Sequence, residues 1–272
     1  MIRRRVAAAI AAAILLASSG GASAQRPRPS IRVLVFNVHA GKDAGGGRNM
    51  DGVAALVRSS NADIVLLQEV DRGTRRSGNV DQLQVLEDLT KYSAVFGRSL
   101  DYDGGQYGVA ALARQRIEQS ATEPLPIQPP QARAGGSYEP RVALTFATST
   151  SLGALLVLNT HLDASNDEHY RVQESAHILA MLKRMAVKRL FVAGGDFNAE
   201  PGSATYEQVV SGGLKDAWRE CGKGDGFTYP AVKPVKRIDY LFLARDLRCT
   251  SAEVIDTRVS DHRPLLVTLT RR

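Results

Sequence analysis

Cysteine and tryptophan are scarce in this chain, and no apolar run is long enough to form a membrane span. The 272 residues include two cysteines and one tryptophan, and aromatic residues make up 6% of the total. Two distant cysteines cannot supply the thiolate cluster of a structural zinc site. The longest apolar run, Val6 to Ala17, is shorter than the ~20 residues that a spanning helix needs. No internal repeat is evident, which argues against a repeat architecture.

The first segment has the order of residues that is typical of a secretory signal peptide. Arginines at positions 3 to 5 precede the apolar run, and Ala22-Ser23-Ala24 supplies the small residues of a cleavage site. We expect residues 1–24 to be removed between Ala24 and Gln25, so that the protein is secreted or periplasmic. Residues 25–30 contain two prolines and are expected to form an extended lead-in to a single domain over residues 31–272.

The charge balance is mildly basic, and the two cysteines form an even pair. Lysine and arginine number 35 against 28 acidic residues, which gives a formal net charge of +7. Such an excess attracts phosphate-bearing substrates but does not identify nucleic acid as a partner. In an exported chain, Cys221 and Cys249 favour a disulfide; two separate buried thiols are the alternative.

Short apolar runs rich in β-branched residues predict many strands and few helices. The strands are expected at Ile31–Val38, Asp63–Gln68, Tyr107–Leu112, Val142–Ala147, Ala154–Asn159, Arg189–Ala193, Ile238–Leu243, Ala252–Asp256 and Leu265–Thr270. The helices are expected at Met50–Ser59, Asp81–Lys91 and Asp167–Ala186. Helices are too few for strict alternation with strands, which favours an α+β sandwich with helices outside the sheets. A doubly wound sheet is the alternative.

Polar side chains recur where the predicted strands end. They are Asn37, His39, Glu69, Asn159, His161, Asp196, Asn198, Asp239, Asp261 and His262. Each alone could be a turn former or a helix cap. Together they offer the hard oxygen ligands that Mg²⁺ requires and the imidazole that can activate water near neutral pH. The pattern therefore indicates metal-assisted hydrolysis of a phosphoester.

Seven motifs, read in order, resemble those of the endonuclease/exonuclease/phosphatase superfamily. They are FNVHAG, DIVLLQEVD, QYGVAALAR, NTHLD, GGDFNAEPGS, RIDYLF and SDHRPL. The matches run from Ile31 to Leu269, so the resemblance implies a catalytic domain over residues 31–272. The implied fold is a four-layer sandwich of two mainly antiparallel β-sheets flanked by helices. The implied activity is phosphoester hydrolysis.

The resemblance also implies a cation site built from carboxylate and amide oxygens. Glu69 would be the principal ligand of Mg²⁺, with Mn²⁺ as a possible substitute, and Asn37 and Asp261 would complete the metal shell. Asp196 and Asn198, from the GDFN motif, would hold the attacking water or a second metal.

A water-activating pair and a set of phosphate contacts follow from the same resemblance. His262 would be the base, paired with Asp239, and we expect the two side chains to touch. His161 and Tyr107 would hydrogen-bond a phosphate oxygen. Arg141 could make a bidentate phosphate contact, although a surface arginine at a strand start is almost as good an explanation. His39 is expected beside Asn37, near the substrate.

The substrate class stays open at this point. Positive charge favours a nuclease with a groove formed by Arg72, Arg75, Arg76, Lys233, Lys236 and Arg237. A lipid-headgroup phosphoesterase of the sphingomyelinase or phosphoinositide type is the alternative, although the segment from Ala121 to Glu139, read as a loop, offers no aromatic tip for a membrane. A binding module without catalysis would lack the expected residues, and all of them are present. No obligate protein partner is evident, so a monomer is expected.

Overall fold

The computed structural model describes residues 28–128, 139–185 and 189–272. The predicted leader at residues 1–24 and the first part of the lead-in lie outside the described residues, so their assignment stays a prediction. Within the described ranges, no helix is both long enough and apolar enough to cross a membrane.

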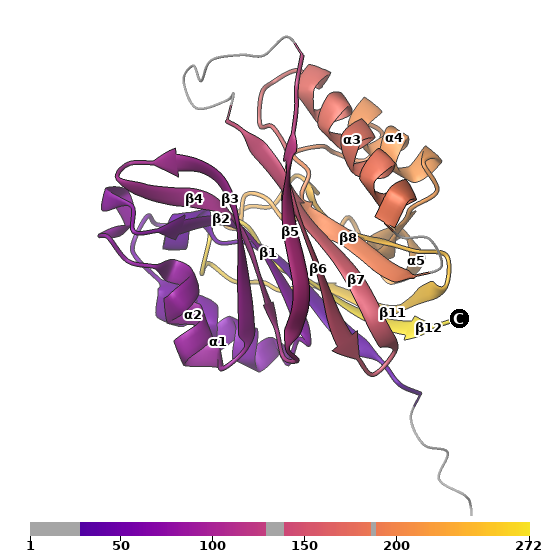
Figure 1. The fold of residues 1–272 in the computed structure, drawn as a ribbon, viewed down its shortest axis with the longest axis horizontal. Helices are drawn as coiled ribbons and strands as arrows, with labels where there is room; N and C mark the ends of the chain where they lie inside the picture. The colour runs from indigo at the N-terminus through magenta and orange to yellow at the C-terminus, as the bar shows by residue number, and fades with distance from the viewer. Residues whose placement is uncertain (1–27, 129–138, 186–188) are drawn as a thin grey trace, which may run out of the picture.

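Two six-stranded sheets form the centre of the molecule (Figure 1). In the first sheet the order is β11-β12-β1-β2-β4-β3. Its strands are β1 (Ile31–Asn37), β2 (Ile64–Arg72), β3 (Ser93–Tyr102), β4 (Gly105–Ala113), β11 (Leu247–Val254) and β12 (Leu265–Arg271). The pair β1 and β2 is parallel, and every other neighbouring pair in this sheet is antiparallel.

The second sheet has the order β5-β6-β7-β8-β10-β9. Its strands are β5 (Ile117–Leu125), β6 (Arg141–Thr150), β7 (Gly153–His161), β8 (Leu190–Asp196), β9 (Lys215–Asp216) and β10 (Asp239–Leu243). Only β7 and β8 run parallel among its described pairs. Both sheets are thus mainly antiparallel, as predicted, and the doubly wound alternative is wrong.

Helices cover the outer face of each sheet and complete four layers. The helices α1 (Met50–Ser60) and α2 (Gln82–Thr90) pack on the first sheet, and α3 (His169–Met185) and α4 (Ala204–Ser211) pack on the second. Three of them follow a residue whose side chain accepts a backbone N–H, namely Asn49 for α1, Asp81 for α2 and Ser203 for α4. The short helix α5 (Ala217–Cys221) lies beside β11.

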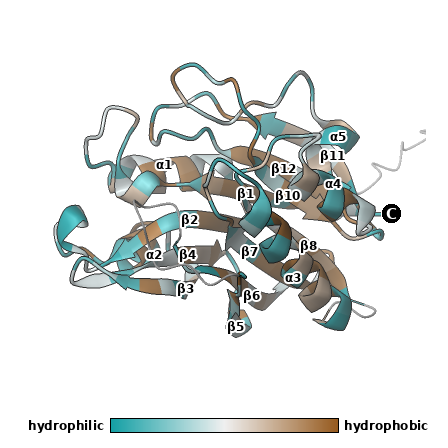
Figure 2. Cartoon of the chain, turned by 90° about the horizontal axis from the view of Figure 1, so that it is seen from above, coloured by the Kyte–Doolittle hydropathy of each residue, from teal (hydrophilic) through white to brown (hydrophobic). Residues whose placement is uncertain are grey.

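The main hydrophobic core lies between the two sheets, and hydrophobic residues concentrate in their strands (Figure 2). Val35 and Leu66 of the first sheet belong to one buried cluster with Val157 and Leu241 of the second. A polar clamp crosses the same interface, where Gln68 Nε2 donates to Asn159 Oδ1 at 2.7 Å. The Asn159 amide in turn donates to the backbone oxygens of Leu67 and Ala110. The two sheets are therefore held in register by hydrogen bonds as well as by apolar burial.

Several predicted elements differ from the observed ones. The edge strands β3 and β5 and the helices α4 and α5 were not predicted, and the segment from Ala121 to Glu139 begins in β5 instead of in a loop. The strand predicted at Ala252–Asp256 is β11, which begins earlier, at Leu247. The predicted disulfide is confirmed, because Cys221 at the end of α5 is bonded to Cys249 in β11.

Candidate active site

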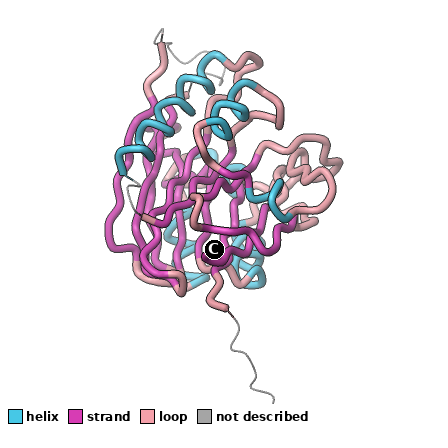
Figure 3. The backbone as a smooth tube through the Cα atoms, turned by 90° about the vertical axis from the view of Figure 1, so that its right-hand side faces the viewer, coloured by secondary structure: helices cyan, strands magenta, loops and turns pink. Residues whose placement is uncertain are grey.

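The polar residues singled out in the sequence gather at one end of the sandwich. Asn37, His161 and Asp196 end β1, β7 and β8, whereas Arg141 and Asp239 begin the antiparallel strands β6 and β10. Strands of opposite direction thus bring their ends and starts to one edge. Figure 3 shows long loops projecting on one side of the strands.

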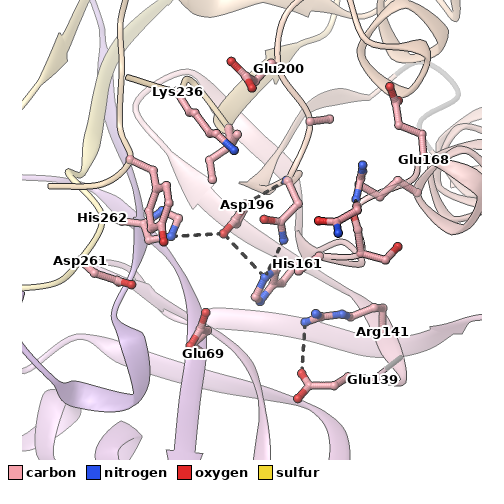
Figure 4. Close-up of a pocket in the computed structure, with 18 of the residues that line it drawn as sticks. Glu69, Glu139, Arg141, His161, Glu168, Asp196, Glu200, Lys236, Asp261 and His262 are labelled. Atoms are coloured by element: carbon pink, nitrogen blue, oxygen red, sulfur yellow. Dashed lines mark hydrogen bonds and ion pairs between the residues drawn. The ribbon is translucent and has the colours of Figure 1, made fainter. Parts of the chain in front are cut away.

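A cavity of about 610 Å³ opens at this edge (Figure 4). Its wall is made almost wholly of polar side chains, which suits a charged, hydrophilic ligand. The lining includes Glu69, Arg76, Tyr107, Glu139, Arg141, His161, Glu168, Arg171, Asp196, Asn198, Glu200, Tyr229, Lys236, Asp261 and His262.

Glu69 reaches the cavity through a β-bulge and not through the end of a strand. The sequence pattern predicted that the strand stops at Gln68, but β2 continues to Arg72. The pairing with β4 shifts register between Leu67 and Val70, and Glu69 has a φ of 58°. A left-handed backbone at a glutamate is costly and occurs where surrounding structure enforces it. The bulge turns the carboxylate toward the cavity (Figure 4).

Asn37 joins carboxylates from the two sheets. Its Nδ2 donates to Glu69 Oε1 and to Asp196 Oδ2, both at 3.0 Å. Its Oδ1 accepts the backbone N–H of His39 at 3.0 Å, which fixes the orientation of the amide. In this arrangement Asn37 orients two of the carboxylates. Its predicted role as a direct metal ligand, which the second lone pair of Oδ1 would allow, stays a prediction.

His262 and Asp239 touch, as predicted. His262 Nδ1 lies 2.9 Å from Asp239 Oδ2, and His262 Nε2 lies 3.7 Å from Asp196 Oδ2. Burial by itself lowers the pKa of His262, but the charge and hydrogen bond of Asp239, with the charge of Asp196, raise it to about 10. The imidazole therefore holds its proton at neutral pH unless positive charge near these carboxylates opposes them.

The donor set at this edge fits a divalent cation. Oxygen or nitrogen atoms of Asp196, Asp239 and His262 all lie within 4.8 Å of one another. Burial, followed by the charge of Asp239, raises the pKa of Asp196 to about 7. A cation would relieve this repulsion between buried carboxylates, and carboxylate oxygens are the ligands that Mg²⁺ prefers. Glu69 and Asp261 line the same cavity and add two further carboxylates near Asp196 and His262 (Figure 4).

His161 is a buried imidazole beside Asn198. Asn198 Nδ2 lies 3.1 Å from His161 Nε2 and donates to the Leu162 backbone oxygen at 3.0 Å. Burial, together with the positive charges of Arg141 and His262, lowers the pKa of His161 well below its usual value. A neutral imidazole can orient a polar group without carrying charge. Asn198 itself has a φ of 47°, a second strained backbone at this edge.

Arg141 and Tyr107 also line the cavity, and both are buried. Arg141 is 4% exposed, its Nη1 lies 3.6 Å from Glu139 Oε2, and its Nε has no hydrogen-bond partner among the described residues. Burial lowers the pKa of Arg141, but the nearby acidic groups outweigh this effect and raise it. A buried guanidinium with an unused donor at a cavity is suited to an anion such as phosphate.

His39 is outside the cavity wall, although it was predicted near the substrate. Its Nδ1 lies 3.6 Å from Asp261 Oδ1, so it contacts the rim through that carboxylate. Sequence reasoning missed Tyr229, whose ring centroid lies 4.8 Å from that of His262, and Glu139, Glu168 and Glu200. Glu200 lies inside the quoted GGDFNAEPGS motif but was given no role, and none of the quoted motifs contains Tyr229, Glu139 or Glu168.

The proposed groove of basic residues is largely neutralised. Four of its six members form ion pairs, namely Arg72 with Asp81, Arg75 with Asp103, Arg76 with Asp71, and Arg237 with Asp216. Paired arginines offer little net charge to a phosphate backbone. Only Lys236 and Arg76 of the six line the cavity, so the cavity itself is not a groove formed by all six residues.

The fold and the site define a class of metal-assisted phosphoesterase, and comparison with known proteins agrees. A model of the "Endonuclease/Exonuclease/phosphatase family" matches residues 34–262. The chain belongs to this family, whose members are phosphoester hydrolases that generally depend on divalent metals.

Several relatives and solved structures resemble the chain. It is 28% identical over 204 residues to the inositol phosphosphingolipids phospholipase C of Schizosaccharomyces pombe, with 70% of this chain and 46% of that protein covered. The chain thus spans about half the length of that curated relative. A mannosyl-6-phosphatase of Bacteroides thetaiotaomicron has a TM-score of 0.73 at 20% identity, covering 88% of this chain and 99% of its own. The human Nocturnin catalytic domain has a TM-score of 0.71 at 22% identity, covering 90% and 94%.

Proposed function

We propose that this chain is an exported, Mg²⁺-dependent phosphodiesterase in which His262 activates the attacking water. The observation that carries the proposal is the pairing of His262 Nδ1 with Asp239, which turns Nε2 toward Asp196 and the cavity. Asp239 fixes the tautomer and orientation of the ring. A cation held by the neighbouring carboxylates would offset the charge that keeps the ring protonated, so that Nε2 could accept a proton from water. The water oxygen then bonds to phosphorus and the ester oxygen leaves, giving a phosphomonoester and an alcohol.

The other residues around the cavity would bind the cation and the phosphate. Glu69, Asp196 and Asp261 would hold Mg²⁺, which when bound supplies positive charge to the phosphate oxygens. Arg141 and Tyr107 would hold the phosphate from the cavity wall, and stabilise the charge that builds up as the fifth bond to phosphorus forms. His161 would orient a phosphate oxygen from its place beside Asn198.

A compact headgroup diester is the substrate class that the site supports best. The cavity wall combines acidic residues, Glu139, Glu168 and Glu200, with basic residues, Arg76, Arg141 and Lys236, so it offers no run of positive charge for the repeated phosphates of nucleic acid. The similarity to a protein named inositol phosphosphingolipids phospholipase C supports the same class. A nuclease is the second candidate. The formal charge favours it, +7 for the whole chain and +4 (7 − 3) once the three arginines of residues 1–24 are removed.

The test is a substrate panel with the protein lacking residues 1–24. Bis-p-nitrophenyl phosphate, sphingomyelin, a phosphoinositide, DNA and RNA are each incubated with Mg²⁺ and with excess EDTA. We expect hydrolysis of the generic diester and of a lipid headgroup, with loss of activity in EDTA. Full activity in EDTA would refute the metal-dependent mechanism, and DNA as the preferred substrate would favour the nuclease.

Glu69→Ala tests the metal site directly. We expect the Mg²⁺ concentration for half-maximal activity to rise at least about tenfold, because a carboxylate ligand is lost. Calorimetric titration with Mn²⁺ gives a readout that does not depend on turnover. Glu207→Gln, which removes an exposed carboxylate on α4, is the matched control. An unchanged Mn²⁺ affinity in Glu69→Ala would place the ligand elsewhere.

A further inference from the structure

The loop between α5 and β10 exposes two valine side chains to solvent. Val232 is 55% exposed and Val235 is 51% exposed. In the described part of the chain, only Leu89, at 38%, joins them among exposed large hydrophobic residues. Two of the three exposed large hydrophobic residues in the described part of the chain thus lie three positions apart on one loop, whereas such residues are normally scattered singly.

The loop is fixed at its base, so the valines cannot fold back onto the protein without breaking hydrogen bonds. Tyr229 and Lys236 exchange backbone hydrogen bonds of 3.0 and 2.9 Å, and the Val235 N–H donates to the Tyr229 oxygen at 2.9 Å. The Ala231 N–H donates to the Asp261 backbone oxygen at 2.6 Å, and Arg263 Nε donates to the Ala231 oxygen at 2.8 Å. These hydrogen bonds therefore hold the tip of the loop, with its two valines, in an exposed position.

The same loop borders the candidate active site. Tyr229 and Lys236 both line the cavity, and the ring of Tyr229 packs against His262. Figure 4 shows Lys236 among the side chains that surround the cavity. A surface that contacts the two valines would therefore lie close to the opening of the cavity.

Two lysines beside the valines indicate which kind of surface the loop would bind. Lys233 lies between them in sequence, Lys236 follows, and both lysines are exposed. Apolar side chains flanked by lysines suit the boundary between acyl chains and anionic headgroups, where the apolar parts leave water and the ammonium groups stay near phosphate. A nucleic acid offers no apolar layer for the valines.

We propose that residues 231–236, the valine-lysine loop, dock on an anionic lipid surface and bring the cavity to headgroup level. The proposal rests on the proposed function for what the cavity does there, namely cleavage of a headgroup diester. Docking itself needs no turnover, so binding and hydrolysis can be measured separately.

The experiment is co-sedimentation with phosphatidylcholine vesicles that contain none or a third phosphatidylserine, using the full protein without residues 1–24. We expect binding to the anionic vesicles only. The double variant V232S/V235S should bind about tenfold more weakly because it loses two apolar contacts, and Lys233→Gln about fivefold more weakly. Leu89→Ser on α2 and Lys183→Gln on α3 are matched controls that should bind like the unaltered protein.

Turnover of soluble bis-p-nitrophenyl phosphate distinguishes failure of the docking proposal from failure of the proposed function. V232S/V235S should hydrolyse this diester at the normal rate but lose activity toward headgroups in vesicles. Equal vesicle binding by V232S/V235S and by the unaltered protein, or no binding to anionic vesicles at all, would overturn the docking proposal even if the diester is hydrolysed. Binding that depends on the valines, without hydrolysis of any diester, would support docking while refuting the proposed function.

Discussion

His262 lies between two carboxylates, with Asp239 at 2.9 Å on one side and Asp196 at 3.7 Å on the other. We expect His262→Ala to lower kcat at least about 10²-fold, because general-base catalysis contributes roughly 10² to 10⁴ in rate. Asp239→Asn should lose a substantial part of the same rate contribution. The losses should be strongly non-additive in the double variant, since two residues that act as a unit share one function.

The measurement is steady-state kinetics on a generic phosphodiester at saturating Mg²⁺. His177→Ala is the matched control, because His177 also pairs with a carboxylate, Glu123 at 2.8 Å, but lies on α3 outside the cavity wall. Near-normal turnover in His262→Ala, or additive losses in the double variant, would exclude this pair as the base.

Individual site residues were predictable where a short motif fixes both the residue and its place at a strand end. Asp196 in GDFN and His262 in SDH are of this kind. Glu69 was found by its motif, but its conformation was not, because a bulge depends on the pairing of β2 with β4, far away in sequence. The contact of Tyr229 with His262 likewise depends on loop packing.

At the level of elements, α3 carries a buried acid that should make stability depend on pH. Glu174 is 1% exposed and accepts the Asp163 backbone N–H at 2.8 Å. Burial raises its pKa from 4.5 to about 7, despite that hydrogen bond and the charge of Arg141. The folded state therefore favours the protonated acid. Its contribution of about 3 kcal/mol is fully present below pH 4.5 and is lost as pH rises through 7.

Replacing Glu174 by Gln removes this titration while keeping the shape of the side chain. We expect Glu174→Gln to be more stable than the unaltered protein at pH 8 and similar to it at pH 5. Urea unfolding at both pH values, in EDTA, measures the difference. Glu253→Gln, an exposed position on β11, should show no such pH-dependent gain. A gain of equal size at both pH values would contradict the raised pKa.

The disulfide joins two other elements, α5 and β11. It closes a loop with a sequence separation of 28, for which chain-entropy reasoning gives about 3 to 4 kcal/mol of stabilisation. We expect C221S/C249S to lose stability of this order in urea unfolding while kcat stays normal, because neither α5 nor β11 supplies a cavity-lining residue. A large loss of kcat at full folding would mean that the bridge also positions the site.

Strand prediction succeeded where apolar residues are continuous and failed at the edges of the sheets. The central strand β1 is almost wholly buried, whereas β5 is exposed at most positions and contains Pro124. An edge strand hydrogen-bonds on one side only, so its sequence lacks the apolar signal of a buried strand. The polar sequence of β5 becomes a strand because β6 supplies its partner.

The whole molecule is expected to leave the cell without its first 24 residues. The predicted leader lies outside the described residues, and β1 begins at Ile31. We expect N-terminal sequencing of the exported protein to begin at or close to Gln25, since Ala22 and Ala24 satisfy the small-residue pattern of cleavage. An exported protein that keeps its leader would instead support an anchor.

The division of the site between two sheets has a consequence for how the enzyme is made. Asn37 and Glu69 belong to the first sheet, and Asp196 and Asp239 belong to the second. His262 directly precedes β12, which returns to the first sheet and pairs with β1. During synthesis, then, a growing chain can contain Glu69, Asp196 and Asp239 while it still lacks Asp261 and the base, His262. The chain would therefore hydrolyse no phosphoester until β12 pairs with β1. The onset of hydrolytic activity would mark the pairing of the last strand with the first.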